Sequence, residues 1–486
     1  MGKLSRNISI TPSMSGVVNV LLIVGLLLIA YCIVMQRWYF LTVVLFLPTT
    51  LIILLYATKR PIFSYVLLGA VTCYFSAIYR YSGIKGLSII MEILILFCLF
   101  SIITSKIAYN KNYPIKRAFN IYTIAHFVWL SYCFLILITP YATLHNFIDD
   151  RALYFTLPLT YILSGLLLCG PKQLRATILL YALFVLTAAF KAYWQKRKGF
   201  DSAELKFLLI DGGYSTHILR TGMRYFSFFT DAGNFGASMG IFTTTFGIIT
   251  TAVKRPVFKI VSLGITILAF IGMLLSGTRG AIIVPIAGLV LYLLLSKSLV
   301  RCAVAGLTGA LIFCFFSYTD IGESNVFIRR MRTAFRPSQD ASFNVRLDNQ
   351  RRLAYYLADK PFGMGVGGKV VDTQRIRTID EEFIPTDSFY VGVWVEGGIV
   401  GLLLYISLQI LVLLRCCYLL MFKIRHKQLR HILSALLCAV FGVWVNGYVG
   451  RCMEFQPGMF TIAVFISLVL NGPIIERKLK KDEIII

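Results

Sequence analysis

Long apolar runs alternate with short polar connections along most of the chain. Each run is about 20 residues long, which is the length that an α-helix needs to cross the apolar core of a membrane. The runs are continuous, whereas the strands of a membrane barrel alternate at every second residue. The pattern therefore predicts an all-α protein, a polytopic bundle of transmembrane helices. About 14 spans are expected, at residues 16–35, 39–57, 61–79, 86–104, 118–139, 153–170, 174–194, 236–253, 257–275, 280–297, 299–318, 399–421, 432–450 and 458–475.

The composition also indicates a membrane protein. Hydrophobic residues make up 58% of the 486 residues and charged residues only 14%, against about 25% charged in an ordinary soluble domain. The first apolar run is too long for the core of a signal peptide, and no small-residue cleavage site follows it. We therefore expect it to be an uncleaved first span.

The placement of the basic residues predicts the orientation of the bundle. The net charge is +26, and Lys and Arg are enriched in the short cytoplasmic connections of membrane proteins. An orientation with both termini in the cytoplasm puts most short basic connections on the cytoplasmic side. Nucleic-acid binding is not expected, because the basic residues form no basic domain. The basic residues of the predicted cytoplasmic connections are Lys59, Arg60, Lys106, Lys111, Lys116, Arg117, Lys172, Arg175, Lys254, Arg255, Lys297, Lys423, Arg425, Lys427 and Arg430.

Two polar segments are too long to be turns, and both fall on the outer side, at residues 195–235 and 319–398. The second segment is expected to contain short helices. One of them, in residues 325–337, would lie on the membrane surface. Another would begin at Ser342 or Asn344 and stop at Pro361. These segments divide the chain into an N-terminal transmembrane bundle, a central transmembrane region with arginine motifs, a large outer loop, and C-terminal helices with a cytoplasmic tail, at residues 1–194, 195–318, 319–398 and 399–486.

Cysteine and histidine indicate no metal site. The 11 cysteines contain no CxxC pair, and the histidines lack the spacing of metal ligands. Most of the cysteines lie inside apolar runs, where they are small core residues. No GxSxG nucleophile motif occurs. We expect neither a metal ion nor a cofactor.

One arginine interrupts the apolar sequence LLSGTRGAIIVP, residues 274–285. Arg279 falls at the outer ends of two predicted spans, and Gly277 and Gly280 beside it allow another backbone to come close. Arginine stays charged and binds phosphate through two parallel hydrogen bonds, so a phosphate site is one interpretation. The other is an interfacial arginine that reaches the lipid headgroups.

A second group of polar residues precedes the span at residues 236–253. The sequence HILRTGMRYFSFFTDAGNFG brings Arg220, Arg224 and Asn234 to the outer membrane boundary, beside several aromatic residues. An interfacial belt of aromatic residues and cations is one interpretation. The other interpretation is that these residues form a binding site for an anionic group together with Arg279.

Glycines and two carboxylates mark the end of the long outer loop. The sequence DKPFGMGVGG does not have the spacing of a dinucleotide motif, and its glycines are expected to make a tight turn against the bundle. Asp387 precedes a helix, where it is either an N-cap or a general base for an acceptor hydroxyl. Glu396 lies in the following apolar helix, either as a hydrogen-bond partner in the core or as a carboxylate of the site.

The motifs of the C-terminal half occur in an order that resembles a known family. RYFSFFTDAGNFG precedes a span, SGTRGA opens another, and VRLDNQRRLAYYLADKPFGMGVGG is followed by TDSFYVGVWVEGGIVG around a large outer loop. In this region, residues 217–420, the chain resembles the O-antigen ligase and O-antigen polymerase superfamily of bacterial membrane proteins. The resemblance implies a GT-C-like bundle in the inner membrane and a metal-independent, inverting glycosyltransferase without a cofactor.

The implied reaction transfers a glycan from undecaprenyl diphosphate to an acceptor hydroxyl at the periplasmic face, in the synthesis of O-antigen and lipopolysaccharide. The implied partners are this carrier-linked donor, the surrounding membrane lipids, and an acceptor. The acceptor is lipid A core for a ligase and a second carrier-linked glycan for a polymerase. Many ligases of the family have a His-Asn or His-Ser pair where this chain has Asp387 and Ser388. By position in the motifs, the implied catalytic residues are Asp387 and Arg279, and the implied substrate-binding residues are Arg220, Arg224, Arg346, Asn234 and Glu396.

A transporter or flippase for lipid-linked glycans is the main alternative. Such a protein is expected to carry its charges near the middle of the membrane, in broken helices, and to show an internal repeat. Here the predicted spans are mostly uninterrupted, no repeat is visible, and the charges gather on the outer side. The pattern favours an enzyme at the membrane interface.

Overall fold

The computed structural model describes residues 55–84, 86–139, 152–219, 222–296, 299–322, 332, 341–366, 375–377, 383–386 and 388–479. The predicted span at residues 16–35, almost all of the span at 39–57 and most of the surface helix at 325–337 lie outside this set. Arg220 and Asp387 lie outside it as well.

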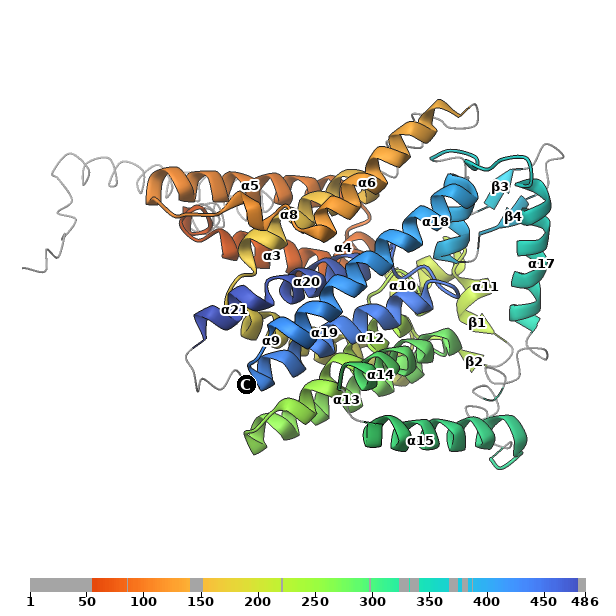
Figure 1. Ribbon diagram of the computed structural model, residues 1–486. Helices are drawn as coiled ribbons and strands as arrows, with labels where there is room; N and C mark the ends of the chain where they lie inside the picture. Colours follow the sequence, from red (N-terminus) through yellow and green to blue (C-terminus); the bar gives the residue numbers. More distant parts are fainter. Residues whose placement is uncertain are drawn as a thin grey trace, which may run out of the picture. The chain divides into compact units, whose positions relative to one another are not determined.

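The described residues are nearly all helical (Figure 1). Eight helices are long and apolar enough to cross a membrane, and the number rises to 10 if each of two bent helix pairs is one span. The prediction of an all-α, multi-pass membrane protein is therefore confirmed.

The α-helices are α3 (Pro61–Cys73), α4 (Phe75–Ser82), α5 (Ser88–Tyr109), α6 (Ile121–Leu135), α8 (Leu157–Leu167), α9 (Pro171–Lys198), α10 (Ser202–Leu209), α11 (Tyr214–His217), α12 (Ala232–Ala252), α13 (Pro256–Leu275), α14 (Ile283–Ser296), α15 (Leu299–Tyr318), α17 (Ala341–Tyr356), α18 (Phe389–Tyr418), α19 (Lys427–Asn446), α20 (Gly458–Leu470) and α21 (Gly472–Lys478). Shorter helical turns are η1 (Ile115–Arg117), η2 (Ile136–Ile138), η3 (Ala152–Thr156), η4 (Arg279–Ile282) and η6 (Leu419–Lys423). Two antiparallel hairpins pair β1 (Ile218–Leu219) with β2 (Gly222–Met223) and β3 (Arg375–Arg377) with β4 (Phe383–Pro385).

The chain divides into two compact units. One consists of Met1–Ser64 and Phe97–Asn112, and the other of Tyr65–Leu96 and Tyr113–Ile486. The second unit contains all the sequence motifs considered above. The candidate site therefore lies within this unit.

Two helices form the centre of the second unit. In α12 and α19, 78% of the apolar stretch is buried inside the protein, against 28% in α13 and 22% in the segment Arg279–Ser296 that includes α14. The outer helices α13 and α14 pack on α12, and α14 and α20 pack on α19. An apolar helix whose side chains remain exposed is suited to lipid, so this layering is the one expected of a membrane bundle.

The long helix α18 is broken near its start. Gly398 has a φ of +64°, in the left-handed region that glycine adopts without steric cost. The turn formed by residues 361–365 packs against the break. The backbone N–H of Met364 donates to the carbonyl of Val395 at 2.8 Å. The N–H of Gly365 donates to the carbonyl of Glu396 at 2.9 Å. These bonds satisfy carbonyl groups at the break, and the expected glycine turn against the bundle is confirmed.

Two other spans are bent. Helix α3 meets α4 at 61°, and α20 meets α21 at 58°. The second bend falls at Asn471, whose buried side-chain amide donates to the carbonyls of Gly165 and Leu168 at 3.0 Å each. Together with the break at Gly398, these bends interrupt three of the described spans, whereas the other described spans are continuous, as the expectation of mostly uninterrupted spans requires.

The helix predicted in the outer loop is α17. It begins one residue before Ser342 and ends ahead of Pro361, as the sequence pattern predicts. Leu353 and Leu357 belong to a buried cluster that includes Val395 and a residue of β4. The predicted apolar face of this helix is confirmed, and it packs α17 against the first part of α18.

Candidate functional site

Arg224 joins two of the sequence motifs directly. Its Nη2 donates to the hydroxyl of Thr278 at 2.8 Å, and its Nε donates to the carbonyl of Ser276 at 3.3 Å. Its Nη1 donates to the carbonyl of Thr216 at 2.9 Å. The segment before α12 and the SGTRGA turn, residues 276–281, are therefore parts of one structure, although they are distant in sequence.

The SGTRGA turn is also held by two helices. The hydroxyl of Thr278 donates to the carbonyl of Ala232, the first residue of α12, at 2.9 Å. The side-chain amide of Asn446, the last residue of α19, donates to the carbonyl of Gly280 at 2.7 Å. Arg279 begins η4 between these two contacts, and its side chain is partly exposed. Two central helices, α12 and α19, thus fix the backbone on both sides of Arg279.

His217 is a residue of this region to which the sequence assigns no role. Its ring is buried; Nδ1 lies 2.8 Å from the carbonyl of Gly213, and the N–H of Ala232 donates to Nε2 at 3.1 Å. An Nε2 that accepts a hydrogen bond carries no proton, so the ring is neutral with its proton on Nδ1. Burial lowers the pKa of His217, although the bond to Gly213 and the charge of Asp231 oppose this shift. Nδ1 also lies 2.8 Å from the hydroxyl of the adjacent Thr216. The sequence did not reveal the role of the ring because its contacts with Gly213 and Ala232 are with backbone groups.

Asp231 and Asn234 organise the first turn of α12. The carboxylate of Asp231 caps the helix by accepting from the N–H of Asn234 at 2.9 Å. The side chain of Asn234 is buried, and its amide donates to the hydroxyl of Thr230 at 3.0 Å and to the carbonyl of Gln456 at 2.9 Å. Asn234 thus connects α12 to the loop that precedes α20, and its predicted contact with substrate stays a prediction.

The loop between α19 and α20, residues 447–457, supports the start of α18. The backbone N–H of Phe389 donates to the carbonyls of Gly447 and Gly450 at 3.0 and 3.2 Å. We call residues 447–457 the α19–α20 loop. Asn446, the residue that precedes this loop, contacts the SGTRGA turn.

An ion pair in the α19–α20 loop reaches the segment that precedes α18. Arg451 pairs with Glu454, and its Nη1 donates to both the carbonyl and the hydroxyl of Thr386 at 3.3 Å. Only 8% of the Arg451 side chain and 10% of the Glu454 side chain are exposed. This contact could not be predicted from the sequence, because Thr386 and Arg451 lie far apart in the chain.

Ser388 is the N-cap of α18. Its side chain accepts a hydrogen bond from the N–H of Val391 at 3.3 Å. The interpretation of Asp387 as the N-cap is therefore corrected, since its neighbour performs this role. Asp387 itself lies outside the described residues, and its predicted role as general base stays a prediction.

Arg346 and Glu396 lie on helices that pack together. Arg346 is partly exposed on α17, one turn before the buried Asn349. Glu396 is partly buried in the first part of α18, two residues before the break. The buried cluster of Leu353, Leu357, Val391 and Val395 packs the two helices together, whereas contact of Arg346 and Glu396 with a substrate stays a prediction.

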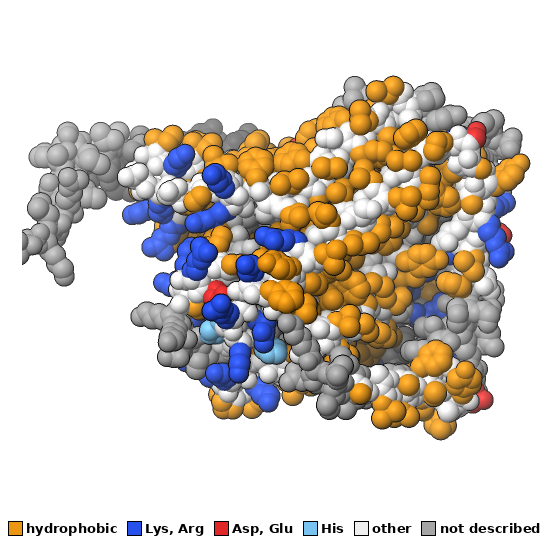
Figure 2. All heavy atoms as spheres, viewed as in Figure 1, with side chains coloured by type: hydrophobic (Ala, Val, Ile, Leu, Met, Phe, Trp, Pro, Cys, Tyr) orange, Lys and Arg blue, Asp and Glu red, His pale blue; other side chains and the backbone are white. Residues whose placement is uncertain are grey.

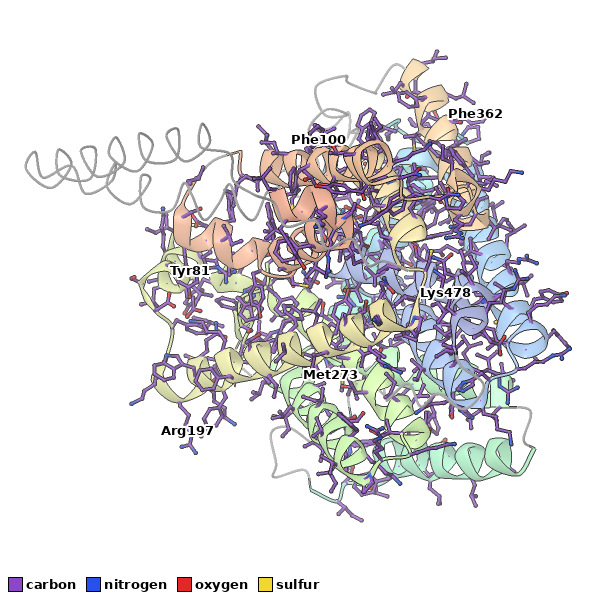
Figure 3. All side chains as sticks on the ribbon, turned by 90° about the vertical axis from the view of Figure 1, so that its left-hand side faces the viewer. Tyr81, Phe100, Arg197, Met273, Phe362 and Lys478 are labelled. Atoms are coloured by element: carbon purple, nitrogen blue, oxygen red, sulfur yellow. The ribbon has the colours of Figure 1, made fainter. Side chains whose placement is uncertain are left out.

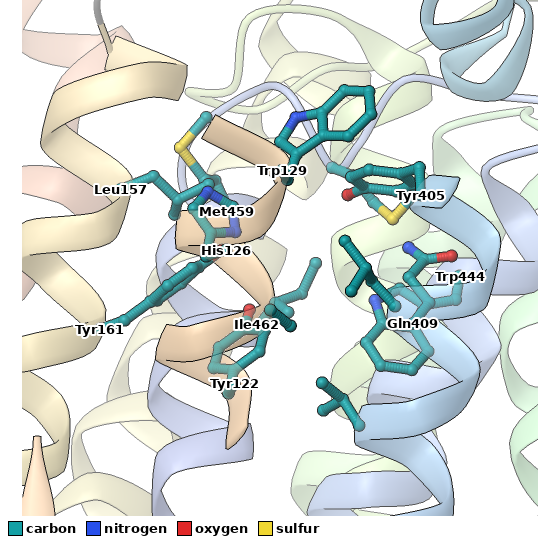
Figure 4. A pocket seen from close by; sticks show the side chains of 14 residues that line it. Tyr122, His126, Trp129, Leu157, Tyr161, Tyr405, Gln409, Trp444, Met459 and Ile462 are labelled. Atoms are coloured by element: carbon teal, nitrogen blue, oxygen red, sulfur yellow. The ribbon is translucent and has the colours of Figure 1, made fainter. Parts of the chain in front are cut away.

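A small cavity lies inside the bundle, next to the α19–α20 loop (Figure 4). Its volume is about 50 Å³, and aromatic rings form much of its wall. The side chains of Lys, Arg, Asp and Glu are absent from its lining, so it suits an apolar group better than a phosphate. The lining residues are Tyr122, Ala125, His126, Trp129, Leu157, Tyr161, Tyr405, Leu408, Gln409, Val412, Trp444, Met453, Met459 and Ile462.

The chemistry available at the end of the bundle that carries the motifs comes from cations and hydrogen-bond donors. Within the part of the chain that the structure describes, no three His, Cys, Asp or Glu side chains come together as a metal site would require. Arginine fixed at a membrane boundary is suited to binding a diphosphate, because its planar fork forms paired hydrogen bonds with phosphate oxygens.

The fold and the site define a multi-pass membrane protein whose polar motifs converge at one end of a helical bundle. Residues 264–406 match the family model described as O-antigen ligase. The match includes the SGTRGA turn, α17 and the broken start of α18, and it supports a place in the O-antigen ligase and polymerase superfamily. It covers less than a third of the 486 residues and ends before the α19–α20 loop. No curated protein and no solved structure matches the chain.

Proposed function

We propose that this protein is a membrane glycosyltransferase of the O-antigen ligase or polymerase type. It would transfer a glycan from undecaprenyl diphosphate to an acceptor hydroxyl at the periplasmic face of the bacterial inner membrane. The acceptor would be lipid A core or a second carrier-linked glycan. The observation that carries the proposal is the direct bond from Arg224 to Thr278, since it joins two family motifs around Arg279.

The proposed reaction is a single displacement at the anomeric carbon. The acceptor oxygen forms a bond to this carbon from the face opposite the diphosphate, which inverts the linkage. The bond from the anomeric carbon to the diphosphate oxygen breaks, and the electron pair leaves with undecaprenyl diphosphate. The carboxylate of Asp387 takes the hydroxyl proton. Arg279 stabilises the charge on the departing diphosphate, so the step needs no metal ion.

The remaining predicted residues have supporting roles in this proposal. Arg220 and Arg346 would add positive charge for the diphosphate, and Glu396 would bind the glycan. The contacts of Arg224 and Asn234 favour a structural role over direct binding of substrate, because their side-chain N–H groups donate to backbone carbonyls of the protein. We therefore propose that these two residues position the site in addition to any contact with substrate.

The proposed topology has about 14 spans, with both termini in the cytoplasm and the four regions 1–194, 195–318, 319–398 and 399–486. Support comes from the charges at the two ends of α18. Figure 2 shows Lys and Arg side chains gathered around α21, η6 and the start of α19, which pack together at one end. The opposite end of α18 packs near α17 and β4 (Figure 1). Because basic residues mark the cytoplasmic side, the motifs would face the periplasm.

A flippase for lipid-linked glycans is the second candidate. The break at Gly398 favours it, because broken spans are frequent in transporters. The enzyme remains the better proposal, since the family match includes this break and describes an O-antigen ligase.

The test is the lipopolysaccharide and carrier-lipid profile of a deletion strain that receives wild-type protein, Arg279→Ala or Arg197→Ala. Arg197 is the matched control, because it is exposed at the end of α9 and points away from the bundle (Figure 3). Loss of long chains with single repeat units left on core would indicate a polymerase. Bare core with long chains on the carrier would indicate a ligase.

We expect Arg197→Ala to restore the profile and Arg279→Ala to fail at wild-type abundance. A normal profile with Arg279→Ala would contradict the proposed role of Arg279. Accumulation of repeat units on the cytoplasmic face would favour the flippase.

A further inference from the structure

We propose that Arg451 is the positioning residue for the acceptor side of the site, and that it acts through Thr386. The inference rests on the proposed function and adds a residue outside the region that the family model matches. We call residues 386–389 the acceptor-side segment, because it contains the proposed base Asp387.

The geometry of Arg451 fixes its side chain in one orientation. Its Nε donates to Oε2 of Glu454 at 2.7 Å, and the two side chains form an ion pair that is almost completely buried. The guanidinium is planar, so the carboxylate that holds Nε also sets the direction of the remaining N–H groups. Nη1 then reaches two oxygen atoms of Thr386.

The acceptor-side segment is held at both ends by the same loop. Arg451 binds Thr386 at one end, and the carbonyls of Gly447 and Gly450 accept from Phe389 at the other. Asp387 and Ser388 lie between these two points in the chain. The position of the segment therefore depends on the position of the α19–α20 loop.

The α19–α20 loop also relates this segment to Arg279. Asn446, which precedes the loop, donates to the carbonyl of Gly280 beside Arg279. A transfer reaction needs the base and the leaving-group cation at a fixed separation, and small displacements of reacting groups lower the rate strongly. Arg451 is thus placed to affect the chemical step without contacting the donor.

The central experiment compares Arg451→Lys, Glu454→Gln and the double exchange Arg451→Glu with Glu454→Arg. Purified protein in proteoliposomes receives carrier-linked glycan and acceptor extracted from the deletion strain. The measurements are kcat, the KM for the donor and the melting temperature. Lysine keeps the ion pair but lacks the planar fork, and the double exchange keeps the charges but removes the donor to Thr386.

Arg451→Lys is expected to lower kcat about 10- to 100-fold with an unchanged KM for the donor, as for the loss of a hydrogen bond to a charged group. The double exchange is expected to restore the melting temperature but not kcat. If the exchange restores both, the ion pair has only a structural role and the inference is wrong.

A milder variant decides the case in which Arg451→Lys folds poorly. Thr386→Val removes only the hydroxyl acceptor and keeps the carbonyl, so kcat is expected to fall several-fold, about the effect of one weakened hydrogen bond. Thr386→Ser keeps the hydroxyl and is the matched control. Equal kcat values for the two variants would overturn the inference.

Two further variants separate this inference from the proposed function. If Arg279→Ala and Asp387→Asn abolish transfer while Arg451→Lys keeps the wild-type kcat, the positioning role alone is wrong. If Arg279→Ala and Asp387→Asn both transfer glycan at the wild-type rate, the catalytic roles proposed for these two residues are wrong, and the positioning role of Arg451 is wrong with them.

Discussion

The two sides of the candidate site are held in different ways. On the donor side, Arg224 joins the segment before α12 to the SGTRGA turn. His217 in this segment accepts from the N–H of Ala232, and Asn446 of α19 donates to the carbonyl of Gly280 in the turn. On the acceptor side, the contacts described for Thr386 and Phe389 run to the α19–α20 loop. The donor side is thus held by side chains that connect it to α12 and α19, whereas the acceptor side is held through the α19–α20 loop. Substitutions of the side chains that hold the donor side should mainly reduce stability, whereas Arg279→Ala and substitutions on the acceptor side should mainly reduce the rate.

Arg224→Ala is expected to have the largest effect on stability. It removes three hydrogen bonds from a charged donor, and each such bond contributes about 1.5–3 kcal/mol. The melting temperature of the purified protein should therefore fall well below that of the wild type, and Arg224→Lys should recover only part of the loss. An unchanged melting temperature with lost transfer would instead mean that Arg224 mainly binds substrate.

His217→Ala is expected to have an intermediate effect that depends on pH. The substitution leaves the N–H of Ala232 without its acceptor, which costs about 1–3 kcal/mol at neutral pH. The folded-state pKa of His217 is lowered, so its contribution to stability is fully present above the pKa of the unfolded chain, about 6.5. It is lost as the pH falls through the folded-state pKa.

The difference in melting temperature between wild type and His217→Ala should therefore narrow between about pH 7.5 and pH 5. A difference that grows on acidification would mean that the folded protein prefers the charged ring. His217→Gln is a useful control, because its amide oxygen offers an acceptor that does not titrate in this range.

Ser388→Ala is expected to have the smallest effect on stability. The loss of an N-cap costs about 1 kcal/mol, and α18 keeps its other contacts. Ser388→Asp retains a capping oxygen and should keep the wild-type melting temperature. Ser388→Ala should lower kcat more than it lowers the melting temperature. If Ser388→Ala lowered the melting temperature as much as Arg224→Ala does, the proposed difference between the donor side and the acceptor side would be wrong.

The sequence predicted the elements whose signals are local. Helix α17 has a polar start, a helical repeat of apolar residues and a following proline, and its apolar face is buried where the pattern indicates. The transmembrane helices follow from the length of the apolar runs. The glycine turn at residues 361–365 follows from composition, because few other residues adopt its backbone conformation.

The features that the sequence did not predict depend on contacts between distant segments. The break at Gly398 is stable because residues 361–365 satisfy its carbonyl groups. His217 contacts backbone groups of Gly213 and Ala232 in addition to the hydroxyl of Thr216, and backbone groups leave no signal in the side-chain pattern. Arg451 resembles any interfacial arginine until its contact with Thr386 is known.

The most direct test of the account is whether undecaprenyl diphosphate is released when glycan is transferred. Purified protein in proteoliposomes would be mixed with carrier-linked glycan and acceptor from the deletion strain, and both products would be quantified over time. The account predicts equal amounts of released carrier diphosphate and extended acceptor with wild type, and neither product with Arg279→Ala. Movement of intact carrier-linked glycan across the bilayer without release of the diphosphate would contradict it.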